Sequence, residues 1–216
     1  TCIAPDYLFI HTSKKEEFIK HFKDELINAY GENPEKSADF PRIVNEKNFN
    51  RLALMLENEE FLVGGKTNKV DNYISPTLIN EPSLDSEVMK SEIFGPILPL
   101  ISFESEEEIE EILSKFNKPL AFYIFSNDKN ISKKMIEKHS FGGGTINDTT
   151  VHFINHRLPF GGVGESGIGG YHGKKSFDTF THSKGVVTRG NWLDLPIRYA
   201  PYTDKLKKLR TLLKWI

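Results

Sequence analysis

Residues 97–125 decide the fold, and they open with the run Ile97-Leu98-Pro99-Leu100-Ile101-Ser102-Phe103. This run is short and almost wholly apolar, which is typical of a strand buried on both faces of a sheet. Ser105 then begins a segment to about Phe116 in which apolar residues recur at helical spacing. A second short apolar run follows at residues 120–125. A strand, a helix and a strand in this order predict a parallel β-α-β unit.

The same alternation continues on both sides of this unit. Upstream, residues 7–10 predict a strand, and Ser13 with Glu16 predicts a capping box that begins a helix of about four turns. Downstream, residues 131–139 predict a helix and residues 144–147 a strand. We therefore expect an α/β fold with a mostly parallel sheet.

The composition is that of an ordinary globular domain. Of the 216 residues, 38% are hydrophobic and 27% are charged, with a net charge of −2, so nothing favours a nucleic-acid partner. The single cysteine excludes a disulfide within the chain and fits a reducing compartment. No apolar run approaches the roughly 20 residues that span a membrane, and the first residues carry no signal-peptide pattern. These features predict a cytoplasmic protein.

A glycine-rich stretch resembles a nucleotide-binding motif only superficially. Residues 162–167, Gly162-Val163-Gly164-Glu165-Ser166-Gly167, satisfy the pattern G-x-G-x-x-G. That pattern binds a dinucleotide only between a strand and a helix, with an acidic residue about 20 positions on. Here Pro159 lies just upstream, and Val187 occupies the position of the acid. We expect instead a tight backbone crossing that only glycine permits.

Histidine and cysteine give weak signals when they are taken alone. His152 and His156 would share a metal ion only on one face of a helix, and Asn155 between them predicts a segment that is not helical. We therefore expect no metal site. A lone cysteine is more often a small buried side chain than a nucleophile. Cys2 precedes Pro5 and a strand, which predicts a turn at a strand entry.

Three motifs in order along the chain carry a resemblance to a known family. They are Thr1-Cys2-Ile3-Ala4-Pro5-Asp6-Tyr7, then Glu92-Ile93-Phe94-Gly95-Pro96, and then Leu158-Pro159-Phe160-Gly161-Gly162-Val163-Gly164-Glu165-Ser166-Gly167 followed by Tyr171-His172-Gly173-Lys174. Together they resemble the aldehyde dehydrogenase superfamily, most closely its class 3 branch, from residue 1 to about residue 190. The chain is similar to the C-terminal, catalytic-domain portion of such an enzyme, beginning at the catalytic-cysteine motif.

The resemblance implies an arrangement of domains. Residues 1–182 would form a three-layer αβα catalytic domain, residues 183–190 a strand that joins the sheet of a partner subunit in a homodimer, and residues 191–216 a tail helix. The expected apolar stripe of that helix consists of Leu206, Leu209, Leu213 and Ile216. The favoured interpretation is a helix docked on its own dimer, and the alternative is contact with an anionic membrane surface.

The resemblance also implies a mechanism. Cys2 would attack an aliphatic or aromatic aldehyde as a thiolate and give a thiohemiacetal. Hydride would pass to NAD or NADP, and water would hydrolyse the resulting thioester to a carboxylic acid. In the family, the base glutamate, the oxyanion asparagine and most of the NAD(P)-binding fold lie upstream of the cysteine. These residues are therefore expected to be inactive without an N-terminal half.

Seven further positions match functional residues of the family. Glu92 matches a residue that hydrogen-bonds the nicotinamide ribose, and Phe94 a residue beside the nicotinamide. The substrate side is expected to be formed by Asn147, Thr150, Phe153, Ile154 and Phe160. Without the family, Glu92 would be interpreted as a surface acid and Phe94 as part of the core.

Two other functions stay open at this stage. The chain would then be either a truncated product that only dimerises and mediates interactions, or a thiol hydrolase that uses Cys2 without a cofactor. Production of NAD(P)H from an aldehyde separates the dehydrogenase from both.

Overall fold

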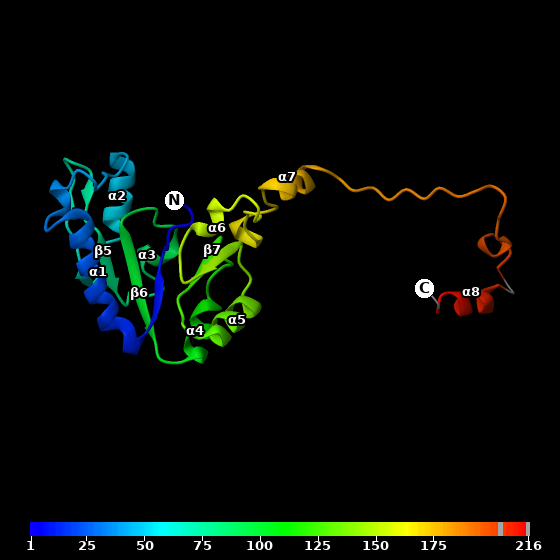
Figure 1. The fold of residues 1–216 in the computed structure, drawn as a ribbon, viewed down its shortest axis with the longest axis horizontal. Coiled ribbons are helices and arrows are strands. Elements are labelled where there is room, and N and C mark those ends of the chain that lie inside the picture. Colours follow the sequence, from blue (N-terminus) through cyan, green and yellow to red (C-terminus); the bar gives the residue numbers. More distant parts are fainter. Residues whose placement is uncertain (203–204, 215–216) are drawn as a thin grey trace. The chain divides into compact units, whose positions relative to one another are not determined.

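The computed structural model describes residues 1–202 and 205–214, and it divides the chain into two units (Figure 1). The first unit covers Thr1–Phe180 and contains all of the sheets. The second covers Thr181–Ile216.

A four-stranded sheet forms the centre of the first unit. Its order is β1-β6-β5-β2, with strands Leu8–His11 (β1), Ile97–Phe103 (β6), Thr77–Asn80 (β5) and Phe61–Val63 (β2). β6 runs parallel to both of its neighbours, whereas the edge strand β2 is antiparallel to β5. Two smaller sheets pair Thr67–Asn68 (β3) with Tyr73–Ile74 (β4), and Ala121–Ile124 (β7) in parallel with Gly143–Ile146 (β8). The predicted α/β fold with a mostly parallel sheet is confirmed.

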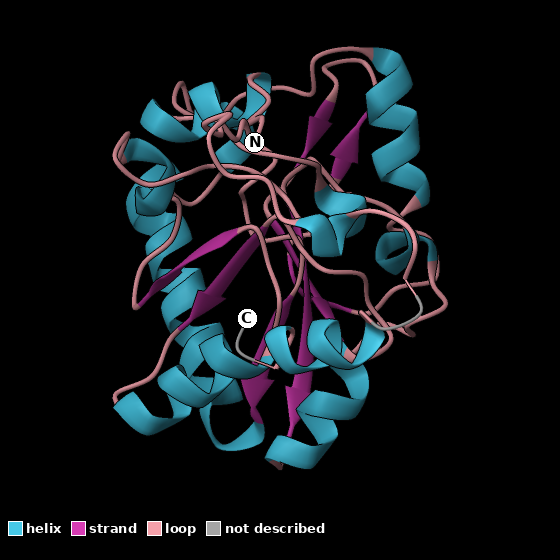
Figure 2. Cartoon of the chain, turned by 90° about the vertical axis from the view of Figure 1, so that its right-hand side faces the viewer, coloured by secondary structure: helices cyan, strands magenta, loops and turns pink. Residues whose placement is uncertain are grey.

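The α-helices lie in the segments that connect or follow these strands. They are Lys15–Tyr30 (α1), Glu46–Leu54 (α2), Glu87–Lys90 (α3), Glu106–Leu113 (α4), Lys129–Lys138 (α5), Val151–Ile154 (α6), Gly173–Phe180 (α7) and, in the second unit, Leu206–Leu212 (α8). Short 3-10 helices lie at Thr12–Lys14, Pro34–Lys36, Gly164–Ser166 and Pro196–Arg198. Figure 2 shows the strands, in magenta, lying among helices in cyan.

Helices cover both faces of the four-stranded sheet, which gives three layers. On one face, Leu78 and Leu100 are fully buried beside Ile19 of α1. The next residues along the same strands, Ile79 and Ile101, belong to a separate cluster with side chains of α2 and α3 on the other face. Side chains alternate between the two faces of a strand, so the apolar residues of β5 and β6 contribute to the core on both sides of the sheet.

The start of α1 corrects one prediction. Ser13 does not cap the helix, because it lies inside the 3-10 turn that precedes α1. That turn is capped by the imidazole of His11, whose Nδ1 accepts a hydrogen bond from the Ser13 N–H at 3.2 Å, whereas Lys14 at the start of α1 makes no side-chain capping hydrogen bond. The far end is as the pattern indicates: Gly31 adopts a left-handed φ of 76° and its N–H donates to the Ile27 carbonyl.

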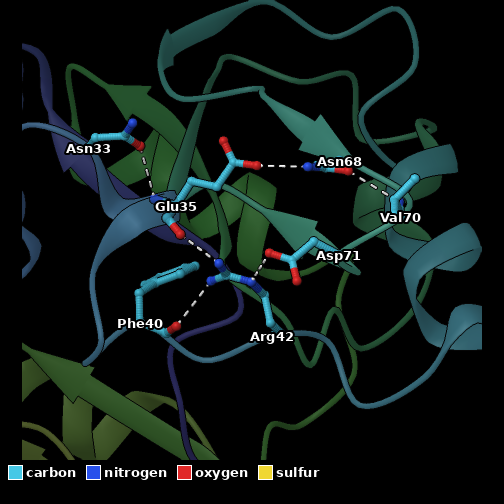
Figure 3. Close-up of polar contacts among 7 residues, drawn as sticks. All are labelled: Asn33, Glu35, Phe40, Arg42, Asn68, Val70 and Asp71. Carbon is cyan, nitrogen blue, oxygen red and sulfur yellow. Dashed lines mark hydrogen bonds and ion pairs between the residues drawn. The ribbon is translucent and has the colours of Figure 1, made fainter.

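The long loop between α1 and α2 is held by Arg42 (Figure 3). Its guanidinium donates to the backbone carbonyls of Glu35 and Phe40 and forms an ion pair with Asp71 at 2.6 Å. The Glu35 carboxylate in turn accepts from the Asn68 side chain at 2.8 Å. The planar guanidinium thereby joins the loop to the β3–β4 hairpin with several charge-assisted hydrogen bonds.

Glu110 joins α4 to the end of α5, and this predicts a pH-dependent contribution to stability. Its carboxylate lies 2.9 Å from Lys138 Nζ and 3.0 Å from His139 Nε2. Burial acts to raise the pKa of Glu110, but the hydrogen bonds from Lys138 and His139 outweigh it, so the pKa is lowered. A lowered carboxyl pKa stabilises the folded state above the unfolded pKa, and the effect is lost as pH falls through the folded pKa.

We expect Glu110→Gln to lower the free energy of unfolding by about 1–2 kcal/mol at pH 7. Urea unfolding measured from pH 7 downwards should show wild type and variant converging at acid pH. Glu111→Gln is the matched control, because the Glu111 side chain is 76% exposed and pairs with the exposed Lys115, two residues beyond the end of α4. A difference for Glu110→Gln that stays constant with pH would contradict the expectation.

The second unit contains little regular structure. Residues 183–190, expected to join a partner's sheet, lie outside any strand in this single chain, and their side chains are exposed. Of the expected tail, residues 191–216, Leu206–Leu212 form helix α8; Leu206 is 54% exposed, and Leu213 beyond the helix is 64% exposed. Ile216, the last member of the expected stripe, lies outside the described residues. Within residues 1–202 and 205–214, no helix is both long and apolar enough to cross a membrane.

Candidate active site

Cys2 lies at the tip of a turn that precedes β1. The turn is closed by a hydrogen bond from the Ala4 N–H to the Thr1 carbonyl at 3.0 Å. Cys2 is exposed, whereas the next residue, Ile3, is only 4% exposed. The buried Ile3 side chain therefore anchors the turn while the thiol faces outward, as a nucleophile requires.

Asp6 ties this turn to the motif at residues 92–96. Its carboxylate accepts a hydrogen bond from the Ile93 N–H at 2.9 Å. Burial raises the pKa of Asp6, and the charge of Glu92 adds to the rise, whereas the Ile93 hydrogen bond and the charge of Arg51 oppose it. Arg51 also donates to the Ile93 carbonyl at 2.6 Å. The segment that bears Glu92 is thus fixed from both sides and lies beside the cysteine turn.

Strand register explains why two motifs 90 residues apart meet. Leu8 of β1 pairs with Leu100 of the parallel strand β6, so the segments that precede both strands lie at the same end of the sheet. Glu92 is exposed there, and Phe94 is 60% exposed with a φ of 50°. A positive φ is uncommon for a phenylalanine and is typical of functional positions. Phe94 is therefore not the core residue that its type alone would indicate.

Tyr123 of β7 holds the turn from the other side. Its hydroxyl donates to the Ile3 carbonyl at 2.7 Å. Burial raises the pKa of Tyr123, the hydrogen bond from the backbone of Thr150 lowers it, and the charge of the Cys2 thiolate raises it. Thr150, which precedes α6, has a φ of 58°, an uncommon conformation for a β-branched residue. Cys2, Tyr123 and Thr150 therefore lie close together.

An aromatic cluster extends from Tyr123 through α6. The His152 ring lies 5.8 Å from Tyr123 and is stacked on Phe160 at 6.0 Å, measured between ring centroids. Phe153 meets Phe160 edge-on at 4.9 Å, and His172 lies 6.2 Å from Phe160. His152 is 7% exposed, and burial lowers its pKa, so the ring is held in its neutral form. Two expected substrate residues, Phe153 and Phe160, thus touch each other within one apolar surface.

The other two expected substrate residues are placed differently. Asn147 Oδ1 accepts from the Ser126 N–H at 2.8 Å, and its Nδ2 donates to the Ser126 carbonyl at 3.1 Å. Both ends of the amide are therefore used to clamp the loop after β7 to the end of β8. Ile154 is 67% exposed at the end of α6.

One prediction about this region is wrong. Residues 151–154 do form a helical turn, α6, because a single turn fits between the left-handed Thr150 and Asn155. The helix ends before His156, whose ring instead contacts His172 at 4.8 Å. Within residues 1–202 and 205–214, no cluster of three or more histidine, cysteine, aspartate or glutamate side chains is suited to hold a metal ion.

The glycine-rich stretch is the expected backbone crossing. A Cβ atom on Gly162 would lie 2.0 Å from the Ser166 carbonyl oxygen and 2.5 Å from the Gly167 nitrogen. Ser166 is itself fixed, since its hydroxyl accepts from the Val163 N–H and donates to the Val163 carbonyl. Phe160, just upstream, exchanges two backbone hydrogen bonds with Tyr171. The stretch therefore holds Phe160 in place and forms no helix-capped nucleotide loop.

Sequence reasoning missed two residues that assemble the site. Asp6 stands within the cysteine motif, but only the fold shows that its carboxylate reaches Ile93. Tyr123 lies in a predicted buried strand, where the need of a buried tyrosine hydroxyl for a hydrogen-bond partner was the available signal.

Comparison with known proteins identifies the family. The family model described as "Aldehyde dehydrogenase family" matches residues 1–186, so the chain belongs to the aldehyde dehydrogenase family. It is 43% identical over 216 residues to 4,4'-diaponeurosporen-aldehyde dehydrogenase of Staphylococcus aureus, covering 99% of this chain and 47% of that protein. It is 44% identical over 190 residues to aldehyde dehydrogenase family 3 member A2 of Rattus norvegicus, covering 88% and 39%. The class 3 resemblance is confirmed.

A solved structure agrees with these relatives. "Substrate bound state of Staphylococcus Aureus AldH" matches with a TM-score of 0.84 and 42% identity, over 99% of this chain and 47% of that one. The chain spans about half the length of the relatives that it matches.

Proposed function

We propose that this chain is the catalytic-domain part of an NAD(P)-dependent aldehyde dehydrogenase that oxidises aliphatic or aromatic aldehydes to carboxylic acids. One observation carries the proposal. The turn that bears the exposed Cys2 is tied by hydrogen bonds to the Glu92–Phe94 segment through Asp6 and to Tyr123 of β7, whose ring packs against His152 of α6. A nucleophile placed between a candidate cofactor surface and an apolar wall is the arrangement that this reaction needs.

The proposed roles follow from what each side chain offers. Cys2 attacks the carbonyl carbon as a thiolate, and its own backbone N–H supports the oxyanion of the thiohemiacetal. Phe153 and Phe160 form the apolar wall that receives the aldehyde substituent, with Thr150 and Ile154 at its edge. Asn147 supports the site indirectly, by holding the backbone of Ser126, because both ends of its side-chain amide are hydrogen-bonded there.

The residues expected to meet NAD or NADP fit that group. Glu92 presents an exposed carboxylate, which suits a ribose hydroxyl, and Phe94 presents an exposed ring on a left-handed backbone. A bound nicotinamide supplies the hydride acceptor for the oxidation. Most of the cofactor contacts are proposed to come from an upstream half, and the chain extended by that half is called the longer protein below.

The proposal extends to a homodimer in the cytoplasm. Relatives named "Aldehyde dehydrogenase, dimeric NADP-preferring", such as that of Canis lupus familiaris at 40% identity, support the dimer. Residues 183–190 would then pair with a partner's sheet, and the single cysteine suits a reducing compartment.

The test compares NAD(P)H formation from a medium-chain aldehyde by residues 1–216 alone and by the longer protein. We expect turnover only from the longer protein, because the base and most of the cofactor fold come from the upstream half. Appreciable turnover by residues 1–216 alone would show that catalysis does not need the upstream half. No turnover by either, with several aldehydes and both cofactors, would favour the non-catalytic interaction module.

A further inference from the structure

Tyr123 contacts both the cysteine turn and α6. Its hydroxyl donates to the Ile3 carbonyl at 2.7 Å, and its ring lies 5.8 Å from the ring of His152, measured between centroids. Ile3 follows the nucleophile directly, and His152 precedes Phe153 in α6. One side chain therefore connects the cysteine turn to the wall against which the aldehyde would lie.

We infer that Tyr123 is a positioning residue, whose hydroxyl fixes the distance and orientation of Cys2 relative to the substrate wall. The inference rests on the proposed function and deepens it.

The way the turn is built explains why such a contact is needed. The cysteine turn contains one internal hydrogen bond, from Ala4 to Thr1, and both of those residues are exposed. Asp6 fixes the chain four residues after Cys2, and the buried Ile3 side chain anchors the turn between them. The Tyr123 hydrogen bond falls on the peptide unit that follows Ile3 and fixes the orientation of the backbone beside the nucleophile. An error of about 1 Å in the attacking atom costs up to about a hundredfold in rate.

The Tyr123 ring is held independently of its hydroxyl. It packs against His152, whose Nδ1 lies 3.4 Å from the Thr145 hydroxyl on the neighbouring strand β8. Tyr123→Phe therefore removes the hydroxyl and keeps the ring contact, so the fold of β7 and α6 should persist.

The experiment measures the longer protein with Tyr123→Phe. The fraction of competent sites is first counted by stoichiometric labelling of Cys2 with iodoacetamide. In a separate, unlabelled sample the rate of the first turnover is then measured as the burst of NAD(P)H, divided by the number of competent sites so counted. We expect the labelling stoichiometry, the KM for the aldehyde and the melting temperature to match wild type, and the burst rate per site to fall about tenfold. Tyr30→Phe is the matched control, because the Tyr30 ring packs on Phe40 in a different part of the unit.

Each other outcome decides against the inference. An unchanged burst rate per site would show that the hydroxyl does not position the thiol. A loss explained wholly by fewer competent sites or a lower melting temperature would make Tyr123 a structural residue only. If Cys2→Ser also kept wild-type turnover, the proposed function would fail first, so the two failures are distinguishable.

Discussion

Cys2→Ser in the longer protein is expected to lower NAD(P)H formation from an aldehyde by at least about a thousandfold. A cysteine is partly ionised near neutral pH and its thiolate is strongly nucleophilic, whereas a serine hydroxyl needs an adjacent base. The measurement is steady-state turnover at saturating aldehyde and cofactor.

The fold should tolerate this substitution. Cys2 is exposed, and the anchoring contacts of its turn belong to Ile3 and Asp6. We therefore expect an unchanged melting temperature, so the loss of rate would report chemistry alone. Ala4→Ser, at an exposed position of the same turn, is the matched control and should turn over like wild type. Turnover by Cys2→Ser at the wild-type rate would show that the nucleophile is another group.

Local patterns predicted the fold well because burial and periodicity act over short stretches. The run at 97–103 is apolar on both faces because α1 packs on one face and α2 with α3 on the other. The helix after Ser105 begins as expected, since the Ser105 hydroxyl accepts from the Glu108 N–H at 3.2 Å. The same signal failed at Ser13, because the 3-10 turn Thr12–Lys14 precedes α1 and contains Ser13. The His11 imidazole caps that turn, and capping patterns do not include histidine, so the sequence gives no sign of it.

The candidate site, too, could be predicted from the sequence only in part. Its motifs are local, so Cys2, Glu92 and Phe160 could be singled out from the sequence. Their juxtaposition is not local, because it depends on the parallel register of β1 with β6 and on hydrogen bonds made by Asp6 and Tyr123 across about 90 and 120 residues. No pattern in the sequence indicates those pairings. The conformations of Phe94 and Thr150 are equally hidden, since neither residue type favours a positive φ.

Gly162→Ala is expected to lower the free energy of unfolding by about 3 kcal/mol. The new Cβ would lie 2.0 Å from the carbonyl oxygen of Ser166, and the other nearest atoms, in Ser166 and Gly167, are also backbone. A clash with a flexible side chain is relieved by rotation, but this one requires the loop to open. Opening breaks the paired hydrogen bonds between Ser166 and Val163. Thermal unfolding of the longer protein should therefore show a melting temperature several degrees lower.

Gly162→Ala should also disturb the apolar wall formed by Phe153 and Phe160, because the glycine-rich backbone crossing lies directly after Phe160. Once the loop opens, the ring contacts of Phe160 with His152 and Phe153 loosen, and the KM for the aldehyde should rise together with the loss of stability. Ile168→Ala is the matched control, since the Ile168 side chain is 99% exposed in the same glycine-rich stretch. Removal of an exposed side chain should leave the free energy of unfolding within about 0.5 kcal/mol of wild type. If the two variants had the same melting temperature and the same KM for the aldehyde, the close approach of two backbone segments would not be the reason for glycine at position 162.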